Sequence, residues 1–376
     1  SIEYGRQIVF SLAIAGLILS HNILAMLFVP ILFGYMVLRR KPYWMALVRG
    51  ILLPAYFWIP ALAERGYVTG LTSINYRDHF PDLVQLLIPS WGTGFSGPGL
   101  VGGEMSFQIG VAALLLSVAT LALVRQEKNR PIRLLILSTL GLFLLGVFLM
   151  LPLSDFVWRL LPVFTYLQYP WRLLSIFLPI VALWAGYVAS RVKKTWVVML
   201  FTVLAVVIAT SYARPVRYEP RTDAHYLTRR EFTDGTSSLG NSFSTIWAPW
   251  KSTRATEKAE VIEGSASVFV TSAKPLSYTL RVDGGLPSVV RVNILYYPGW
   301  TVRVNGTPIP IQFQNDGTIT FQVPEGNSVV RVYFTETPLR RFADWLTVAG
   351  LFWIILSGIL SLYAYRHRHI SPRKRP

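Results

Sequence analysis

The sequence predicts an α-helical polytopic membrane protein of about eight spans, with an extracytoplasmic all-β sandwich domain inserted before the last span. Its composition is apolar: 52% of the 376 residues are hydrophobic and 15% are charged, whereas soluble domains carry about 25% charged residues. A series of short β-branched runs after residue 266 predicts the β domain. Apolar runs close to spanning length lie at 44–62, 108–124, 132–151, 173–190, 195–212 and 345–364.

A further apolar region, 8–38, is interrupted by Ser-His-Asn at 20–22. It fits either two short helices that turn at His21 and Asn22, or one long tilted helix. The two helices are favoured, which gives about eight spans and a cytoplasmic N-terminus. Polar groups within an apolar region are candidates for a functional site, although an interfacial turn with its polar atoms in water explains these two equally well.

The net charge of +17 is concentrated in short stretches that flank the spans. Residues 39–49, 125–133, 191–194 and 366–376 hold 16 Lys and Arg residues and one acid, Glu127. This is the positive-inside pattern, which places these stretches in the cytoplasm. A nucleic-acid-binding protein would gather its basic residues on one aqueous domain, so membrane lipids rather than nucleic acid are the expected partners.

The same pattern predicts the domain boundaries. A transmembrane domain covers 1–212, with outer loops at 63–107 and 152–171, and it is followed by the β domain at 213–343, a final helix at 344–365 and a basic cytoplasmic tail at 366–376. The chain opens "SIEYGRQ", with no methionine and no signal peptide, so we expect it to be the C-terminal part of a longer protein. With no cysteine, it has no disulfide framework.

Within the β domain, strand-like runs recur about every ten residues, a spacing typical of a β-sandwich rather than of alternating βα units. The runs are "SVFVTS", "SYTLRV", "SVVRVNILYY", "TVRV", "IPIQF", "TITFQV" and "SVVRVYF". Turn signals separate them, including Asn-Gly at 305–306 and Asn-Asp-Gly at 315–317. The stretch 214–266 is polar and is expected to be an irregular lead-in with few strands.

The segment "LQYPWR" at 167–172 places a permanent cation at the start of an apolar run. One interpretation is an interfacial anchor, in which Tyr169 and Trp171 join the aromatic belt and Arg172 reaches the headgroups. In the other, Arg172 and Gln168 face a cavity and hold an anion such as a lipid-linked phosphate, because a guanidinium binds phosphate through two parallel hydrogen bonds. A lipid phosphate also lies at headgroup level, so the two interpretations overlap.

The outer loop 63–107 is the longest predicted loop among the spans, and long ordered loops are usually binding elements. Its segment 81–88 fits a short helix along the membrane interface, and six glycines follow at 92–103 without a P-loop signature. Asp78, His79 and Glu104 are its candidate acid–base or metal-binding groups, although a solvated loop explains them as well. No metal-ligand spacing and no cofactor motif is found, and the use of a divalent metal is left open.

Several motifs carry a resemblance when they are taken in order. They are "LSHNILAML" (19–27), "YFWIPALAE" (56–64), "HFPDLVQLLIPSWGTG" (79–94), "EMSFQIG" (104–110), "LQYPWRLL" (167–174) and "YYPGWTVRVNGTPI" (296–309). This succession resembles a bacterial membrane-protein family labelled "6-pyruvoyl-tetrahydropterin synthase-related", akin to YfhO-type proteins. Such proteins are similar to GT-C integral membrane glycosyltransferases, which take sugars from polyprenyl-phosphate carriers.

The resemblance implies a bacterial inner-membrane location and a role in cell-envelope polysaccharide or glycolipid assembly. It implies that Arg172 and Gln168, with Trp171 beside them and His21 as a further candidate, contact the carrier phosphate. The loop 63–107 would close over the donor, and Tyr297 and Trp300 of the β domain would position an envelope glycan acceptor, unless those two aromatics fill the sandwich core. The catalytic carboxylate of such enzymes usually lies in an earlier outer loop, so we expect it to be missing from this sequence.

A second interpretation, from a different class, is a non-catalytic membrane protein: a transporter of the lipid carrier or a scaffold for the β domain. A transporter should show paired broken helices or internal repeats. In the sequence, 8–38 is the only segment that looks interrupted, and no repeat is evident.

Overall fold

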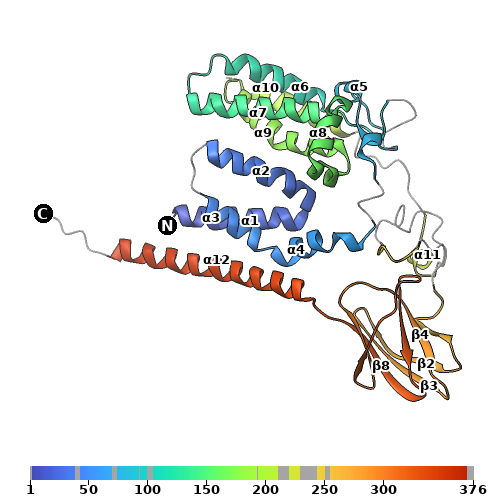
Figure 1. The fold of residues 1–376 in the computed structure, drawn as a ribbon. Coiled ribbons are helices and arrows are strands. Elements are labelled where there is room, and N and C mark those ends of the chain that lie inside the picture. Colours follow the sequence, from blue (N-terminus) through green and yellow to red (C-terminus); the bar gives the residue numbers. More distant parts are fainter. Residues whose placement is uncertain are drawn as a thin grey trace. The chain divides into compact units, whose positions relative to one another are not determined.

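The computed structural model describes residues 2–38, 43–69, 74–92, 94–99, 105–192, 194–210, 220–228, 244–249 and 255–370 (Figure 1). The chain divides into two compact units, which are described separately. The first unit comprises 1–25, 32–73 and 222–376, and the second comprises 26–31 and 74–221. The N-terminal helices are thus grouped with the β domain and the last helix, and not with the helices that follow residue 74.

The region 8–38 forms two helices, α1 (Ile2–Ser20) and α2 (Asn22–Leu38), in agreement with the favoured interpretation. The corner between them is capped by its own polar side chains. His21 Nδ1 accepts a hydrogen bond from the backbone N–H of Leu24 at 3.3 Å, and Asn22 Oδ1 accepts one from Ile23 at 2.8 Å. These side chains therefore satisfy backbone donors that are left free at the start of α2.

The structure corrects the expectation of one unbroken span at 44–62. This segment forms α3 (Trp44–Leu52) and α4 (Ala55–Ala63), and the two helices are bent by 70°. Pro54 lies at the break, and a proline cannot continue a helix because it has no N–H and its ring clashes with the preceding turn. The region 8–38 is therefore not the only interrupted apolar segment.

The helix α12 (Pro338–Ile370) packs along α4 and α3 and supports this break. Thr347 Oγ1 accepts the backbone N–H of Tyr56 at 3.0 Å, which satisfies a free donor in the first turn of α4. Gly350 lies close to the end of α3, where an added Cβ would come within 3.3 Å of Leu52 Cβ. The absence of a side chain at Gly350 therefore allows α12 to pack closely against the bend between α3 and α4.

Small residues also allow α1 and α3 to approach closely. Ser11 and Ala15 of α1 and Ala46 and Gly50 of α3 are all buried, and each pair is spaced four residues apart. Ser11 Oγ donates a hydrogen bond to the carbonyl of Ala46 at 2.8 Å. This small-xxx-small pattern is a common way for membrane helices to associate, because it brings the two backbones together.

Arg49 departs from its expected place in a cytoplasmic flank, because it lies inside α3 with only 3% of its surface exposed. Its Nη1 donates to Ser357 Oγ at 2.8 Å and its Nη2 donates to Gln7 Oε1 at 3.2 Å. The guanidinium also lies over the Trp353 ring at 5.6 Å. This cation is therefore held between α1, α3 and α12 by neutral partners.

The second unit is built on four apolar helices: α6 (Val111–Val124), α7 (Arg130–Met150), α9 (Leu174–Ala189) and α10 (Thr195–Ala209). Two of the basic stretches meet at one end of this unit. The buried Glu127 carboxylate accepts hydrogen bonds from Arg191, from the Asn129 backbone at 2.9 Å and from the Tyr187 hydroxyl at 3.2 Å. The loops after α6 and α9 therefore lie at the same end of the helices.

Three helical segments in the described residues are long and apolar enough to cross a membrane: 130–150, 170–189 and 338–363. The bent pair α3–α4 would make a fourth if it is one broken span. The apolar helices at 5–20, 22–37, 111–124 and 195–209 are shorter. These features indicate membrane association, while the total of about eight spans stays a prediction.

The β domain contains two antiparallel sheets. The smaller sheet has the order β1-β4-β7, and the larger has the order β2-β3-β8-β5-β6. The strands are β1 (Ala259–Glu263), β2 (Ser267–Lys274), β3 (Ser277–Gly284), β4 (Ser288–Leu295), β5 (Trp300–Val304), β6 (Thr307–Ile309), β7 (Thr318–Val323) and β8 (Gly326–Phe334). Six of the seven expected strand runs coincide with strands, and the seventh, "IPIQF", lies mostly after β6.

The core of the β domain follows the alternation of the sequence. Both sheets contribute alternate fully buried residues, such as Val290 and Val292 of β4 and Val330 and Val332 of β8. The Asn-Gly turn between β5 and β6 has φ of 48° at Asn305 and 87° at Gly306, as a two-residue hairpin with positive φ at both positions requires. Of the predicted lead-in 214–266, the described parts include α11 (Asp223–Thr228) and β1.

We predict that Gly50→Ala destabilises the first unit. An added Cβ would lie 2.7 Å from Ile14 Cβ and 2.8 Å from the Ser11 carbonyl oxygen, so α1 and α3 must separate, at a cost of about 1–3 kcal/mol. Gly16→Ala on α1 is the matched control, because nothing lies within 4 Å of its Cβ position. Thermal unfolding of the detergent-solubilised chain should show a lower melting temperature for Gly50→Ala only. Equal melting temperatures for the two variants would contradict this packing.

Candidate functional site

Two outer loops of the predicted topology come together in the second unit. His79 lies at the end of a short 3₁₀ helix, η2 (Tyr76–His79), and Trp171 lies in a second one, η5 (Pro170–Leu173). His79 Nδ1 and the Ser96 carbonyl oxygen are 2.6 Å apart, and Trp171 Nε1 donates to Ser96 Oγ at 2.7 Å. Ser96 therefore links the segment that contains His79 to the "LQYPWR" segment.

The hydrogen bond also fixes the tautomer of His79. A carbonyl oxygen can only accept, so Nδ1 must carry the proton, and Nε2 of the neutral ring keeps its lone pair. The ring is buried and contacts two aromatic residues, Tyr169 at a centroid distance of 4.7 Å and Phe95 at 5.6 Å. His79 is thus a positioned hydrogen-bonding group in an aromatic setting.

Gln168 lies in a strained turn. Its φ is 64° and its ψ is −42°, and the backbone N–H of Tyr169 donates to the carbonyl of Leu167 at 2.7 Å. This is the geometry of a γ-turn with positive φ at its central residue, which is rare and costly for a side chain other than glycine. Such strain persists only where the surrounding structure holds it, so the turn points to a constrained site.

Arg172 supplies that constraint. Its Nη1 donates to both the Leu167 carbonyl at 2.9 Å and Gln168 Oε1 at 2.8 Å, so the guanidinium bridges the turn and the side chain at its centre. The guanidinium also lies over the Tyr169 ring at 4.8 Å. Among the described residues, no carboxylate lies within ion-pair distance of Arg172. Within these residues its charge is therefore compensated by dipoles and an aromatic face.

The glycine-rich loop is ordered by one buried amide. Gln85 lies in α5 (Leu83–Leu87), is 1% exposed, and donates through Nε2 to the carbonyls of Gly97 and Gly99. Its Oε1 accepts the backbone N–H of Asp82 at 2.8 Å. Gln85 thus fixes both the start of α5 and the loop that carries Ser96.

The outward side of this loop is apolar, as the predicted interfacial helix requires. We call these residues the apolar shelf. They are Leu83, Val84 and Leu87 of α5, with Ile88, Trp91 and Phe95 after it, and all are between 42% and 68% exposed. Because Phe95 contacts His79 and His79 contacts Tyr169, the shelf is continuous with the aromatic residues beside Arg172.

An acidic group anchors the other side of η2. Asp155 of α8 (Asp155–Leu160) pairs with Arg77 at 2.9 Å and Arg159 at 3.1 Å, and accepts the Tyr76 hydroxyl at 3.0 Å. The hydrogen bond from Arg77 holds the pKa of Asp155 below its usual value. Burial, followed by the hydrogen bond to Asp155, raises the pKa of Tyr76. Asp155 is therefore an ionised structural group.

The remaining predicted site residues are more scattered. Asp78 is exposed and accepts a hydrogen bond from Asn75 Nδ2 at 3.1 Å, and Glu104 lies outside the described residues. His21 and Asn22 are exposed at the corner between α1 and α2. No group of three His, Cys, Asp or Glu side chains that could hold a metal ion is present in the described part of the chain. The structure thus brings together Arg172, Gln168, Trp171 and His79.

A second polar cluster lies in the first unit, where the β domain meets the helices. Glu64, directly after α4, is buried, and its Oε2 accepts hydrogen bonds from Arg340 Nη2 at 2.7 Å and from the Tyr297 hydroxyl at 3.1 Å. Arg340 belongs to the first turns of α12 and also donates to the Pro298 carbonyl at 3.1 Å. We call Glu64, Arg340 and Tyr297 the junction cluster.

Aromatic packing extends the junction cluster into the β domain. Tyr67 contacts Tyr297 edge-on at 6.0 Å and stacks on Trp247 at 5.7 Å. The segment that carries Trp247 pairs with the chain after α4 through an antiparallel bridge between Val68 and Thr245. The chain leaving α4 is therefore fixed to the β domain by ionic, aromatic and backbone contacts.

The two aromatic residues expected to bind an acceptor are engaged in packing. Tyr297 donates to Glu64, as described above. Trp300 is half-buried against the sandwich core and contacts Phe334 edge-on at 5.5 Å and Tyr278 at 6.4 Å. The position of Trp300 agrees with the alternative in which these aromatics fill the sandwich core, whereas Tyr297 lies at the junction cluster, and acceptor binding by either residue stays a prediction.

Sequence reasoning overlooked several residues that the structure shows to be central. Gln85 and Arg49 are isolated polar residues in apolar runs, and Glu64 ends an apolar run. Burying a polar or charged side chain costs free energy unless it is paired, so each of these positions could have been recognised as one that needs a partner. Ser96 carried no signal, because a serine in a glycine-rich loop is ordinary. Arg340 lay within the predicted β domain 213–343 and was not singled out.

Comparisons of the chain with family models, with curated proteins and with solved structures found no match.

We predict strong coupling between Glu64 and Arg340. Glu64→Gln or Arg340→Met alone leaves a buried partner without compensation, which should lower the free energy of unfolding by about 3–5 kcal/mol. The double variant should recover much of this loss, since both charges are then removed. Denaturant unfolding of the full chain in detergent, followed by tryptophan fluorescence, measures these values.

Asp283→Asn is the matched control for this cycle, because the Arg281–Asp283 pair is exposed and should contribute less than about 1 kcal/mol. If the two junction variants behave additively, the proposed coupling is absent.

We also predict an alkaline loss of stability that depends on Tyr297. Burial, the charge of Glu64 and the hydrogen bond to its carboxylate raise the pKa of Tyr297 from 10.0 to about 12. Because the folded pKa is raised, this stabilisation is present below about pH 10 and is lost as the pH rises towards 12. Melting temperatures of the wild type and Tyr297→Phe across this range provide the test. The variant should show the smaller decrease, and parallel curves would refute the assignment.

Proposed function

We propose that the chain is the carrier-binding part of a bacterial inner-membrane glycosyltransferase that uses a polyprenyl-phosphate-linked sugar in envelope glycan or glycolipid assembly. The observation that carries this proposal is the state of Arg172. It is a half-buried guanidinium with no acidic partner in the described residues, beside an exposed apolar shelf. The resemblance of the sequence motifs to GT-C enzymes supports the choice of reaction.

The geometry around Arg172 suits a phosphate ligand. Nη1 is used by Leu167 and Gln168, which orients the planar guanidinium, while Nε and Nη2 donate to no protein acceptor in the described part of the chain. A guanidinium oriented in this way offers two parallel N–H groups, the arrangement that binds phosphate in a bidentate manner. Trp171 and His79 both contact Tyr169, the ring over which the guanidinium lies, and can provide further hydrogen-bonding or stacking surface.

The apolar shelf suits the lipid part of the same ligand. Leu83, Val84 and Leu87 of α5, together with Ile88, Trp91 and Phe95, form an exposed apolar surface that is linked to Arg172 through His79 and Tyr169, and such a surface near a basic group is the pattern of an interfacial helix. A polyprenyl phosphate presents an isoprenoid chain and an anionic head at this same depth. One molecule can therefore contact the shelf with its chain and Arg172 with its phosphate.

The proposed topology places this site on the outer side of the membrane. The α9 helix runs from the Arg172 end to the Arg191 end, where two basic loops meet at Glu127. Under the positive-inside rule the basic end is cytoplasmic, so Arg172 and the β domain are extracytoplasmic and the tail is cytoplasmic. No residue of this chain is assigned as the catalytic base.

A second candidate, a transporter of the lipid carrier, is favoured by the break between α3 and α4. The 70° bend is the kind of discontinuous helix from which transporters build sites within the membrane. The buried Arg49 one turn before the break adds a cation in the same helix. This candidate predicts movement of an intact lipid carrier, whereas the first predicts transfer of its sugar.

We predict that Arg172→Lys weakens the binding of undecaprenyl phosphate about tenfold, because the ammonium keeps the charge but loses the planar pair of donors. Binding would be measured by tryptophan fluorescence on the full chain in nanodiscs of phosphatidylcholine. The matched control is Arg159→Lys, at an exposed arginine of the same unit that pairs with Asp155. Affinity unchanged in Arg172→Lys would overturn the phosphate role.

An activity assay distinguishes the two candidates. Supplied with a radiolabelled polyprenyl-phosphate sugar, an enzyme should release the label onto an envelope acceptor. Movement of intact labelled carrier across the vesicle membrane, without transfer, would favour the transporter.

A further inference from the structure

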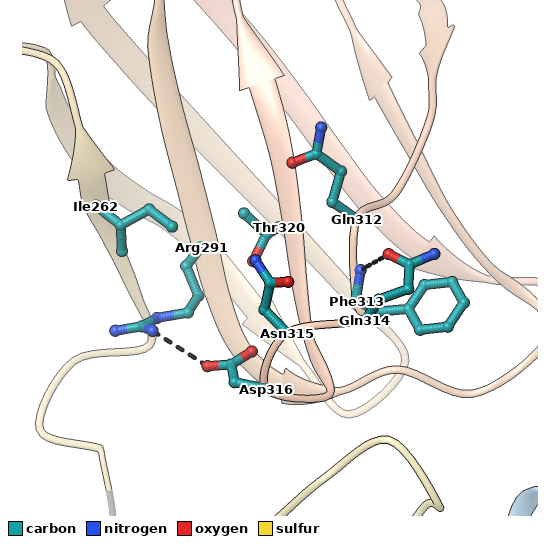
Figure 2. A pocket seen from close by; sticks show the side chains of 8 residues that line it. All are labelled: Ile262, Arg291, Gln312, Phe313, Gln314, Asn315, Asp316 and Thr320. Carbon is teal, nitrogen blue, oxygen red and sulfur yellow. Dashed lines mark hydrogen bonds and ion pairs between the residues drawn. The ribbon is translucent and has the colours of Figure 1, made fainter.

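The β domain contains a hollow of about 330 Å³ on the outer face of its smaller sheet (Figure 2). Arg291 of β4 and Thr320 of β7 alternate with buried core residues, so their side chains point away from the sandwich interior. The loop between β6 and β7 folds back along the β7 edge, where Gln312 and Thr320 exchange backbone hydrogen bonds of 2.7 and 3.0 Å. This loop forms the opposite wall, and the volume falls within the range of ligand pockets.

The walls of the hollow are rich in neutral hydrogen-bonding groups. In Figure 2, Ile262 and Arg291 lie on one side, Gln312 and Phe313 lie on the other, and Asn315 is near the centre. Each amide side chain offers both a donor and an acceptor. Gln312 and Asn315 are exposed, so these groups are accessible to a ligand.

The charges at the hollow are already compensated. Arg291 pairs with Glu260 at 2.9 Å and with Asp316 at 3.2 Å. Asn293 donates to the same Glu260 oxygen as Arg291, at 2.8 Å. Among the described residues at the hollow, one cation lies between two carboxylates, so this lining has no excess positive charge and disfavours an anionic ligand. A neutral ligand with many hydroxyl groups fits this lining best.

The aromatic member of the wall is held rigidly. Phe313 stacks on Tyr296 with a centroid distance of 3.8 Å and an interplanar angle of 10°, and it contacts Trp247 edge-on at 4.9 Å. Trp247 in turn stacks on Tyr67, next to the junction cluster. The hollow therefore combines amide groups with an apolar ring whose position is fixed relative to α4.

We propose that this hollow binds a neutral sugar unit of a glycan. Amide side chains match the paired donor and acceptor character of vicinal hydroxyl groups, and an aromatic ring at the edge packs against the C–H face of a pyranose. As an acceptor site, the assignment rests on the proposed glycosyltransferase function. It differs from the sequence expectation, since it uses Gln312, Asn315 and Phe313 where Tyr297 and Trp300 were expected.

Calorimetric titration of the full chain in detergent tests the proposal, with chitotriose, maltotriose and mannotriose as neutral probes and trigalacturonate as a charged one. At least one neutral trisaccharide should bind, and it should bind more tightly than trigalacturonate. Gln312→Ala and Asn315→Ala should each weaken that binding about fivefold through the lost hydrogen bonds. Because both side chains are exposed, the variants should fold normally, which circular dichroism would verify.

Asn327→Ala is the matched control: it removes an exposed asparagine of β8, in the other sheet, and should leave the affinity within twofold. The proposal is overturned if no neutral probe binds, if trigalacturonate binds best, or if the pocket variants behave like the control. No lipid carrier is present in the titration, so its result is independent of donor binding. The titration with trisaccharides and the binding assay with undecaprenyl phosphate are separate measurements, so the two proposals can fail separately.

Discussion

The shared carboxylate of Glu64 is the contact on which the first unit depends. It receives Arg340 at the start of α12 and the hydroxyl of Tyr297 from the β domain, and it follows the last residue of α4. Three segments far apart in the sequence therefore meet at one buried oxygen. Replacing a buried ion pair by apolar residues often leaves the stability unchanged or raises it. The main contribution of the Glu64–Arg340 pair is therefore to fix the geometry of the segments that it joins. Only one arrangement of the three segments leaves neither charge unpaired.

The direction of α12 follows from that contact. Arg340, Thr347, Gly350 and Ser357 lie on one side of the helix and meet, in order, Glu64, the first turn of α4, the end of α3 and Arg49. At 1.5 Å per residue, this side extends over about 25 Å. The last helix therefore supports the break at Pro54 while it carries the β domain at its N-terminal end. A bent α3–α4 pair without this helix would expose free backbone donors to lipid.

The sequence predicted the parts of the molecule that follow from periodicity and composition. The β strands, the Asn305–Gly306 turn, the corner at His21 and the apolar helices were evident because each depends on local residue patterns. The bend at Pro54 was missed, although proline was visible there, because helices in membranes often tolerate proline when neighbours satisfy the freed groups. Grouping α1, α3 and α4 with the β domain depends on contacts between distant residues, which no local pattern encodes.

The candidate site, too, could be predicted from the sequence only in part. Arg172 and Gln168 were identifiable as polar residues at the edge of an apolar run, and His79 as a titratable group in a long loop. Their mutual geometry was not, because it depends on the γ-turn at Gln168 and on Ser96, which bonds to both His79 and Trp171. Residue types therefore indicated which groups to consider, while the turn and the loop decided which of them meet.

Three arginines in apolar surroundings show how exposure to a ligand distinguishes a structural arginine from a candidate binding residue. Arg340 is matched by Glu64, so its charge is used within the fold. In the described part of the chain, Arg49 has only neutral partners and its Nε has none, but it is 3% exposed and no ligand can reach it without moving a helix. Arg172 also has neutral partners, yet it remains half-buried at the end of its helix with two nitrogen donors uncommitted in the described structure. Desolvation makes an anion favourable at both Arg49 and Arg172, but of these two only Arg172 is open to one, and for this reason we propose the phosphate site there.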